Sequence, residues 1–535
     1  MRKRFLVLGS ILMLLGSFLL INRLQVKNFT VFNQVSPKRV EEVKSSLNRV
    51  EELSFTALLC NEIRVPFDDA TNTFFVPLNM ADAGWEKMEF VSGQPEYQIL
   101  FQEDVTDEEK QEVIASSKKI ELVVFDRQSW AEYYVTFTGL PVIDLSTNEG
   151  FYASEEITGT ATFFDTDFSL HGIEQSAYNG HIRGNTSRMF PKKGYKLNLT
   201  YINEYGEEDN NKLSLFGMRK DDDWILHALY NDDTKIRDRL SMEVWNRMGA
   251  KAVSDDSYYG PKMTYVEVFA DNQYCGLYGL MEPVDGKQLN LAEEDYSYKR
   301  KNPGSVRYKY EEFSEPDNIY GEIEGFEIKD GIMEEDAWMP MANLSAVLTH
   351  DEWKEKLAKS QILNEDSVIR MWIFIQMITG HDHTAKNMYY VAKYDDDLKY
   401  NYQFYFAPWD MDLTWGNVSV GEVNSYYTAF EMDTLDNRVY WSMADMLIDE
   451  NYHQAKDRAR DLYNQLRKTV LTDQVVDEII QSLDHELRDS GAFARDKMRW
   501  PEGIHAKDVS VLRKYAKERL NYLDLAINDF DYFEE

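Results

Sequence analysis

Two kinds of hydrophobic pattern follow each other along this chain. Short apolar runs between charged or turn-forming residues predict strands, whereas apolar residues spaced three or four apart predict helices. The predicted strands are 74–78, 97–101, 120–125, 142–145, 157–164 and 195–199, followed by a hairpin joining 266–270 to 275–281. The predicted helices are 38–53, a pair or long broken helix over 224–249, 366–379, and several between 438 and 530. Residues 286–330 are charged, rich in Tyr, and predicted to be a loop. This order of elements predicts an α+β protein.

A second hairpin is predicted at residues 388–409, with polar side chains at its open end. The apolar runs 388–393 and 402–409 flank a polar turn, so the second run returns antiparallel to the first. Asp382 and Asn387 precede the first strand, and Asp410 and Asp412 follow the second. The return brings Asp410 beside Asn387. Carboxylate and amide oxygens are the ligands that Mg2+ and Mn2+ prefer, so the sequence predicts a metal site there.

Each of these polar residues also has alternative interpretations. Asp and Asn are common in turns and caps, and a surface hairpin with acidic ends would show the same residues. His381 and His383 flank Asp382, and on an extended segment they would point the same way and could hold zinc. No third nitrogen or sulfur ligand stands nearby in the sequence, so the oxygen cluster favours magnesium or manganese.

A basic segment, residues 181–199, stands out in this acidic chain. Its cations are Arg183, Arg188, Lys192, Lys193 and Lys196, placed around a Gly-Asn-Thr-Ser turn. Backbone N–H groups in such a turn, surrounded by cations, form a candidate phosphate site, with a basic surface loop as the alternative. Glu243, in the predicted helix that follows, is a candidate partner for one of the lysines. Asp233 and Arg237 lie four residues apart and predict a structural ion pair.

The N-terminus predicts a membrane segment. Basic residues in Met1–Arg4 precede residues 5–21, which are apolar or small. The run is at the short end for a membrane span, and no small-x-small cleavage pattern follows it. Basic residues before such a run favour an N-terminus inside. We therefore expect residues 1–24 to be an uncleaved signal-anchor with the bulk of the chain extracytoplasmic; a cleaved signal peptide is the alternative.

Composition and length narrow the class of protein. At 535 residues with 43% hydrophobic residues, the chain is long enough for two or three folded domains. Its formal net charge of −35 argues against nucleic-acid binding, which needs a basic surface. We expect a small α+β module of unknown role at 25–136 and the main domain at 137–535. The two cysteines, Cys60 and Cys275, favour buried free thiols over a disulfide.

Several blocks of this sequence resemble the CotH family, the spore-coat-protein-H-like atypical kinases. The blocks are LPVIDLST (140–147), IRGNTSRMFPKKGYKLNL (182–199), DDWILHALYNDDTKIRDRLSMEVWNRMG (222–249), VEVFADNQYCGLYGLMEPVD (266–285), GHDHTAKNMYY (380–390) and APWDMDLTWG (407–416). The resemblance covers about residues 137–530. It implies a divergent, two-lobed protein-kinase-like fold with a mainly helical C-terminal part.

The same resemblance implies transfer of the γ-phosphoryl group of ATP, with Mg2+ or Mn2+, to Ser or Thr of secreted or surface proteins. Asp382 corresponds to the catalytic Asp, Asn387 and Asp410 to the metal ligands, and Asp412 to a second ligand or orienting group. The residues implied to contact phosphates or nucleotide are Lys193 or Lys196, assisted by Arg183 and Arg188, with Glu282 at the end of a strand.

The sequence departs from ordinary kinases at two points. No Arg stands between His381 and Asp382, and no Gly-rich loop of the ordinary pattern is present. Two other functions therefore stay open: a noncatalytic structural or adhesive surface or spore-coat protein, and a metal-dependent hydrolase using Asp382, His383 and Asp410.

Overall fold

The structure of the chain is a computed structural model. It describes residues 32, 35–78, 88–106, 109–152, 154–166, 173–184, 186–249, 260–301, 323, 325–334, 336–384, 386–420 and 427–533. The signal-anchor predicted at residues 1–24 lies outside the described residues. Among the helices in the described ranges, none is both long and apolar enough to span a membrane.

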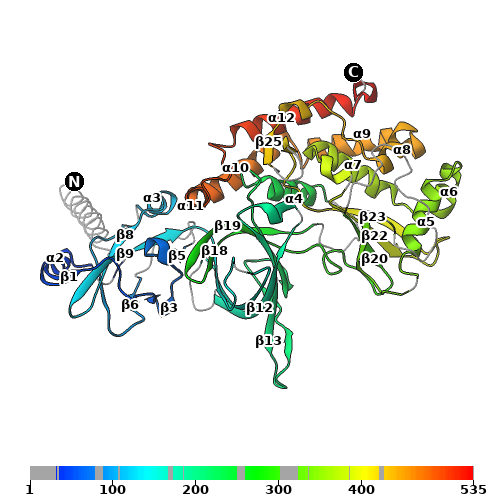
Figure 1. Ribbon diagram of the computed structural model, residues 1–535. Coiled ribbons are helices and arrows are strands. Elements are labelled where there is room, and N and C mark those ends of the chain that lie inside the picture. Colours follow the sequence, from blue (N-terminus) through cyan, green and yellow to red (C-terminus); the bar gives the residue numbers. More distant parts are fainter. Residues whose placement is uncertain are drawn as a thin grey trace, which may run out of the picture. The chain divides into compact units, whose positions relative to one another are not determined.

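The described chain forms two compact units, whose elements are labelled in Figure 1. Unit 1 contains the residues up to Tyr178 together with Tyr265–Leu277 and Leu487–Arg499. Unit 2 contains Asn179–Thr264, Tyr278–Glu486 and the residues from Trp500 onward. Four elements contribute residues to both units: β12 (Ile173–Arg183), β18 (Met263–Ala270), β19 (Gln273–Met281) and α10 (Asp473–Asp489).

Unit 1 is built mainly from strands. A sheet in the order β4-β5-β9-β8-β7 is joined by β1, which pairs with β9, and β3-β2-β6 form a second sheet. β10 pairs with β11 antiparallel and with β18 parallel. The strands are β1 (Asn48–Arg49), β2 (Leu58–Cys60), β3 (Ile63–Arg64), β4 (Phe67–Asp68), β5 (Thr73–Pro77), β6 (Phe90–Ser92), β7 (Gln98–Phe101), β8 (Ile120–Phe125), β9 (Ser129–Thr138), β10 (Val142–Thr147) and β11 (Glu156–Phe164), and the helices are α2 (Pro37–Ser46), α3 (Lys110–Ala115) and α11 (Ala492–Arg499).

The core of unit 1 is rich in aromatic rings. Phe32 stacks on Phe101, and the rings of Phe55, Phe74 and Tyr133 pack edge-on or tilted against one another. Phe74 and Phe101 lie in β5 and β7, which were predicted as strands, whereas Tyr133 lies in β9, which was not predicted. The predicted helix at 38–53 is shorter than expected, since α2 ends at Ser46 and the chain then pairs with β9 as β1.

Both cysteines lie in this unit, and both are buried free thiols. Cys60 ends β2, and Cys275 lies in β19 after the turn Asp271-Asn272, whose positive φ angles of 51° and 60° are typical of a two-residue hairpin. The preference for free thiols over a disulfide is confirmed.

Unit 2 begins with strands that surround the basic segment. β13 pairs with β14 and β17, and β17 pairs with the end of β19. The strands are β13 (Gly194–Ile202), β14 (Glu208–Asn210), β15 (Leu213–Ser214), β16 (Lys220–Asp221) and β17 (Asp223–His227), followed by helix α4 (Arg237–Arg247). The prediction of helix from residue 224 is wrong for its first part. The run Trp224-Ile225-Leu226 is buried in β17, and a short fully buried run has no period that separates strand from helix.

A four-stranded sheet holds the predicted hairpin. Its order is β21-β20-β22-β23, with bounds β20 (Tyr296–Arg300), β21 (Phe326–Asp330), β22 (Met388–Tyr394) and β23 (Tyr402–Pro408). The hairpin β22–β23 is confirmed. The prediction of loop over 286–330 is wrong at β20 and β21. Tyr298, the central residue of β20, is fully buried and packs against Trp338 and Phe404, contacts from distant segments that fix a strand there.

The rest of unit 2 is mainly helical, as predicted for 366–379 and for 438–530. Its helices and remaining strands are α5 (Met339–Leu348), α6 (Trp353–Ser360), α7 (Glu365–Ile378), β24 (Asn417–Val420), β25 (Tyr427–Phe430), α8 (Ser442–Asp449), α9 (Ala455–Lys468) and α12 (Ser510–Ala526). α7 is the central helix, since nearly all its side chains from Ser367 to Ile378 are buried.

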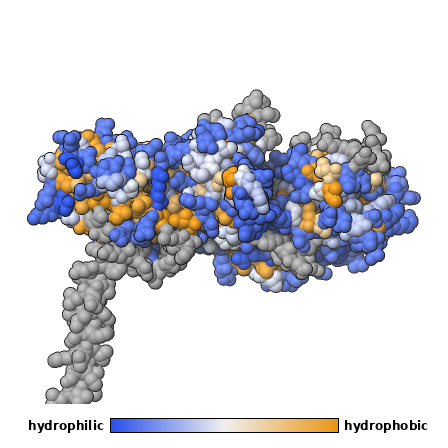
Figure 2. Space-filling view, turned by 90° about the horizontal axis from the view of Figure 1, so that it is seen from below, coloured by the Kyte–Doolittle hydropathy of each residue, from blue (hydrophilic) through white to orange (hydrophobic). Residues whose placement is uncertain are grey.

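Figure 2 shows a mostly hydrophilic face with apolar patches, one of them broad and over the N-terminal strands at the left of the view.

Candidate functional site

The end of helix α7 places Asp382. Asn364 caps the start of the helix by accepting from the backbone N–H of Ser367 at 2.9 Å. Thr379, with φ of 52°, ends it in the left-handed conformation, and the Gly380 N–H closes the last turn on the Ile375 carbonyl at 3.0 Å. A 3-10 turn, η7 (His381–Thr384), follows at once. Asp382 is therefore held on a tight turn directly after a buried helix.

The register of β22 and β23 brings Asn387 beside Asp410. Met388 is paired with Pro408, and the Trp409 N–H donates to the Asn387 carbonyl at 3.0 Å. The side-chain Nδ2 of Asn387 donates to the backbone carbonyl of Asp410 at 3.3 Å. Asn387 and Asp410 both have φ of 59°, in the left-handed region that Asn and Asp tolerate better than most residues. The predicted juxtaposition is confirmed.

Asp412, two residues after Asp410, is held by two asparagines. Asn231 Nδ2 donates to its carboxylate at 2.5 Å, and Asn417 Nδ2 donates to its backbone carbonyl at 3.0 Å. Burial and, next, the carboxylate of Asp410 raise the pKa of Asp412 to about 7, although the bond from Asn231 opposes them.

Sequence reasoning missed a buried pair behind these carboxylates. His227, at the end of β17, lies with Nε2 3.3 Å from the Oδ2 of Asp238, in the first turn of α4. The other oxygen of Asp238 accepts from the Met411 N–H at 3.1 Å, between Asp410 and Asp412. Burial, followed by the charges of Asp412 and Asp410, raises the pKa of Asp238 well above its ordinary value. Burial also lowers the pKa of His227 to about 4, so this His is neutral at pH 7.

Lys386 joins Asp382 to the acidic group. Its Nζ lies 3.0 Å from the Oδ2 of Asp382. Burial alone would lower the pKa of Lys386, but the carboxylates of Asp382, Asp410 and Asp412 outweigh it and the pKa is raised. This cation therefore lies within the field of all three carboxylates. The sequence pattern gave no indication of it.

Two further cations stand over the ring of Trp409, which directly precedes Asp410. The guanidinium carbon of Arg183 is 5.3 Å from the ring centroid of Trp409, and Nζ of Lys299 is 5.5 Å from it. Arg183 was predicted at the site. Lys299 was missed because it belongs to β20, in the segment predicted to be a loop.

The other predicted cations have local partners. Lys193 donates to the carbonyl of Arg188 at 2.6 Å, and Arg188 itself donates to the carbonyl of Ile182 at 3.0 Å. Lys196 forms an ion pair with Asp223 at 3.1 Å.

The two predicted glutamates are held by other partners than expected. Glu243 pairs with Arg247 on its own helix, at 4.0 Å, rather than with Lys193 or Lys196. Glu282 is fully buried and accepts from the backbone N–H groups of Arg219 at 2.9 Å and Lys262 at 3.0 Å. It therefore fixes the end of β19.

The zinc alternative and the expected ion pair are both resolved by the geometry. His381 and His383 lie in the 3-10 turn rather than on an extended segment; His383 is 1% exposed, whereas His381 is exposed. They do not form the paired ligands that the zinc interpretation requires.

Asp233 lies 2.5 Å from Nη1 of the buried Arg237, which confirms the predicted structural ion pair.

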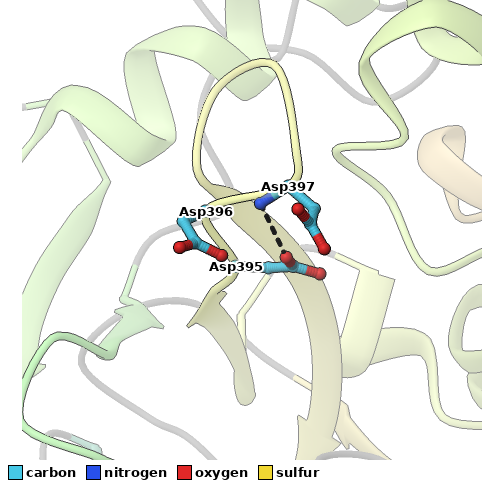
Figure 3. Close-up of side chains that lie close together, drawn as sticks. All are labelled: Asp395, Asp396 and Asp397. Carbon is cyan, nitrogen blue, oxygen red and sulfur yellow. Dashed lines mark hydrogen bonds between the residues drawn. The ribbon is translucent and has the colours of Figure 1, made fainter.

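Among the described residues, one group of three carboxylates lies within 4.8 Å: Asp395, Asp396 and Asp397 (Figure 3). All three are exposed in the turn between β22 and β23, and the Asp397 N–H donates to the Asp395 carboxylate at 3.0 Å. The turn itself explains why they are close together.

The residues at the hairpin's open end fit a hard divalent cation. The donors are the carboxylates of Asp410 and Asp412 and the amide of Asn387, all of the oxygen-rich type that Mg2+ and Mn2+ prefer. Burial is the larger cause of the raised pKa of Asp412, and the charge of Asp410 adds to it; a divalent cation would offset the second of these effects.

Comparison with protein families identifies the chain. Residues 181–523, more than half of the chain, match the family model described as CotH kinase protein. The chain belongs to the CotH kinase family. No curated protein matches the chain. The matched range contains the basic segment, β17, α4, α7 and the hairpin, so the CotH domain includes every residue of the site described above.

Proposed function

We propose that this CotH family chain is a phosphotransferase that transfers the γ-phosphoryl group of ATP to a Ser or Thr hydroxyl. The observation that carries the proposal is the register of β22 and β23. It brings Asn387, which lies five residues after Asp382, beside Asp410. That is the order of catalytic and metal-binding groups in protein kinases. A two-lobed kinase-like arrangement of the CotH domain is part of the same proposal.

Asp382 has the position of the group that orients the acceptor hydroxyl. As the hydroxyl oxygen bonds to the γ-phosphorus, the bond from that phosphorus to the β–γ bridging oxygen breaks, ADP leaves, and the hydroxyl proton passes to Asp382. Lys386, 3.0 Å from this carboxylate, fixes its orientation. Catalysis of this kind depends on positioning and charge neutralisation rather than on a covalent nucleophile.

Asn387, Asp410 and Asp412 are the residues that would hold Mg2+ or Mn2+. The metal, when bound, neutralises charge on the β- and γ-phosphates. Asn231 and Asn417 hold Asp412 in place, and Asp238 holds the backbone between the two aspartates through Met411. These contacts are the outer support that a metal site needs.

The acceptor we propose is a secreted or surface protein. This rests on the basic and then apolar N-terminal sequence, which favours an extracytoplasmic position for the domain.

Labelled ATP tests the proposal. The full-length chain, purified in mild detergent, is incubated with γ-labelled ATP, Mg2+ or Mn2+, and a Ser/Thr-rich protein acceptor. We expect autophosphorylation or transfer that falls about 100-fold or more in Asp382→Asn, which retains nucleotide binding, and in Asp410→Asn, which loses metal-dependent binding. Asp396→Asn is the matched control, since it removes an exposed carboxylate at the other end of the same hairpin.

Two results would reject the proposal. Equal transfer by the wild-type chain and both variants would remove the site assignment. Absence of both transfer and nucleotide binding, together with binding to a coat or wall protein that survives both substitutions, would establish the noncatalytic, structural or adhesive function instead.

A further inference from the structure

The lysines that the sequence predicted for phosphate binding are engaged elsewhere. Lys193 donates to a carbonyl of its own loop, and Lys196 is paired with Asp223 across two neighbouring strands. A cation that is already satisfied must give up its partner before it binds phosphate. Cations near Asp410 without such a partner are therefore the better candidates for binding phosphate.

Arg183 and Lys299 meet this description. Within the described part of the chain, neither side chain forms a hydrogen bond or an ion pair; both are positioned by the ring of Trp409, at 5.3 and 5.5 Å from its centroid. Lys299 lies opposite Tyr389 in the pairing of β20 with β22, and its Nζ is 6.0 Å from that ring as well. Aromatic faces orient a cation without using up its N–H donors.

The two cations lie close to a carboxylate as well as to each other. Burial lowers the pKa of Lys299 to about 8; the charge of Asp410 opposes this shift, and the charge of Arg183 adds to it. Because the ring of Trp409 leaves the N–H groups of both cations available, a multiply charged anion can accept hydrogen bonds from both. Since the charge of Asp410 acts on Lys299, such an anion would adjoin the proposed metal ligands.

We propose that Arg183 and Lys299, rather than Lys193 and Lys196, bind the polyphosphate chain of the substrate. This rests on the proposed function for the choice of a nucleotide, but the anion-binding chemistry is shared with free polyphosphate. Lys299 reaches the site from β20, in the same sheet as the hairpin that supplies Asn387 and Asp410. Metal ligands and phosphate-binding cation are thus carried by one sheet.

Binding measurements with a graded set of ligands test this inference. Calorimetry on the full-length chain in Mg2+ compares ATP, tripolyphosphate and adenosine, for the wild type and for Lys299→Gln, Lys299→Arg, Lys193→Gln and Lys196→Gln. We expect Lys299→Gln to weaken ATP and tripolyphosphate about tenfold or more, the loss of one charge-assisted hydrogen bond, and to leave adenosine unchanged. Lys299→Arg retains the charge and most of the affinity. Lys193→Gln and Lys196→Gln stay within about twofold of the wild type, since neither removes a proposed contact.

The outcomes separate the inference from the proposed function. Wild-type binding of tripolyphosphate but not ATP, lost in Lys299→Gln, would support the cation pair and count against a nucleotide substrate. Unchanged ATP affinity in Lys299→Gln, an equal loss for adenosine, or losses confined to Lys193→Gln or Lys196→Gln would each overturn the inference. Thermal melting of every variant shows whether a lost affinity reflects lost folding. If Lys299→Gln does not fold, Lys299→Arg provides the test. Loss of ATP binding by a folded Lys299→Arg variant would overturn the charge-based argument.

Discussion

A buried ion pair in unit 1 gives the sharpest test of the energetics of this structure. Glu267, on β18, and Arg495, on α11, have side chains that are 0% and 4% exposed. Two parallel hydrogen bonds join them, from Nε to Oε1 at 2.8 Å and from Nη2 to Oε2 at 2.7 Å. The Tyr274 hydroxyl donates to the same carboxylate at 2.6 Å. Ser117 and the Ser490 carbonyl accept from the remaining guanidinium donors at 2.7 and 2.8 Å.

Removal of either partner leaves the other charge buried without compensation. We expect Glu267→Gln or Arg495→Met to lower the free energy of unfolding of unit 1 by about 3–5 kcal/mol. The double variant buries neither charge, so its loss is smaller than the sum of the single losses. The coupling energy should be about 2 kcal/mol, within the range for residues in direct contact. An exposed pair in the same unit, Lys118 and Glu103 at 3.2 Å, offers the control Lys118→Met, with an expected cost below about 1 kcal/mol.

The two cysteines allow unit 1 to be observed separately. Cys60 and Cys275 are both buried and both belong to unit 1, so the reaction of their thiols with a chromogenic disulfide during urea titration reports unfolding of that unit. Because a chain of two units need not unfold in one step, this local probe is preferable to whole-chain fluorescence. A Glu267→Gln variant with less than about 1 kcal/mol of destabilisation, or a double variant equal to the sum of the singles, would refute the reasoning.

Two further predictions concern single residues. Burial raises the pKa of Asp144 to about 6 from 3.8, so the stability that the protonated carboxyl contributes is complete below about pH 4 and is lost as pH rises to about 6. Asp144→Asn should therefore raise the melting temperature relative to wild type at pH 7 but not at pH 3.5. The exposed control Asp396→Asn should leave the melting temperature unchanged at both pH values. Gly416 has φ of 82°, and a Cβ there would lie 2.7 Å from a ring carbon of Phe430; Gly416→Ala should cost more than about 1 kcal/mol in urea unfolding, and an unchanged midpoint would contradict it.

The sequence predicted local geometry better than the surroundings of the site. The hairpin that joins Asn387 to Asp410 depends on period-two patterning and a polar turn, both of which are local signals. The strand β17 was predicted as helix because its apolar run is buried on both sides. His227 and Asp238 meet only because β17 and α4 pack behind the hairpin, and no spacing rule connects them.

The lysines indicated by the sequence differ from the lysine proposed from the structure for a related reason. Lys196 alternates with buried neighbours on β13, and the side of the sheet to which it points depends on pairing with β17, which the sequence did not predict. Lys299 lies in a strand that forms only through contacts between distant segments, such as Tyr298 with Trp338. A single sequence contains the residue types of a site, whereas their grouping depends on tertiary contacts.

The electrostatics of the site are themselves an argument for a ligand. Burial, and then the charges of neighbouring carboxylates, raise the pKa values of Asp238 and Asp412, so the charged forms of these two groups cost folding free energy. Asn387 and Asp410 adopt the left-handed conformation at the same point, which Asn and Asp tolerate better than most residues. A divalent cation with an anionic phosphate chain would offset both the clustered carboxylates and the cations over Trp409, since each ligand neutralises the repulsion within one of these groups.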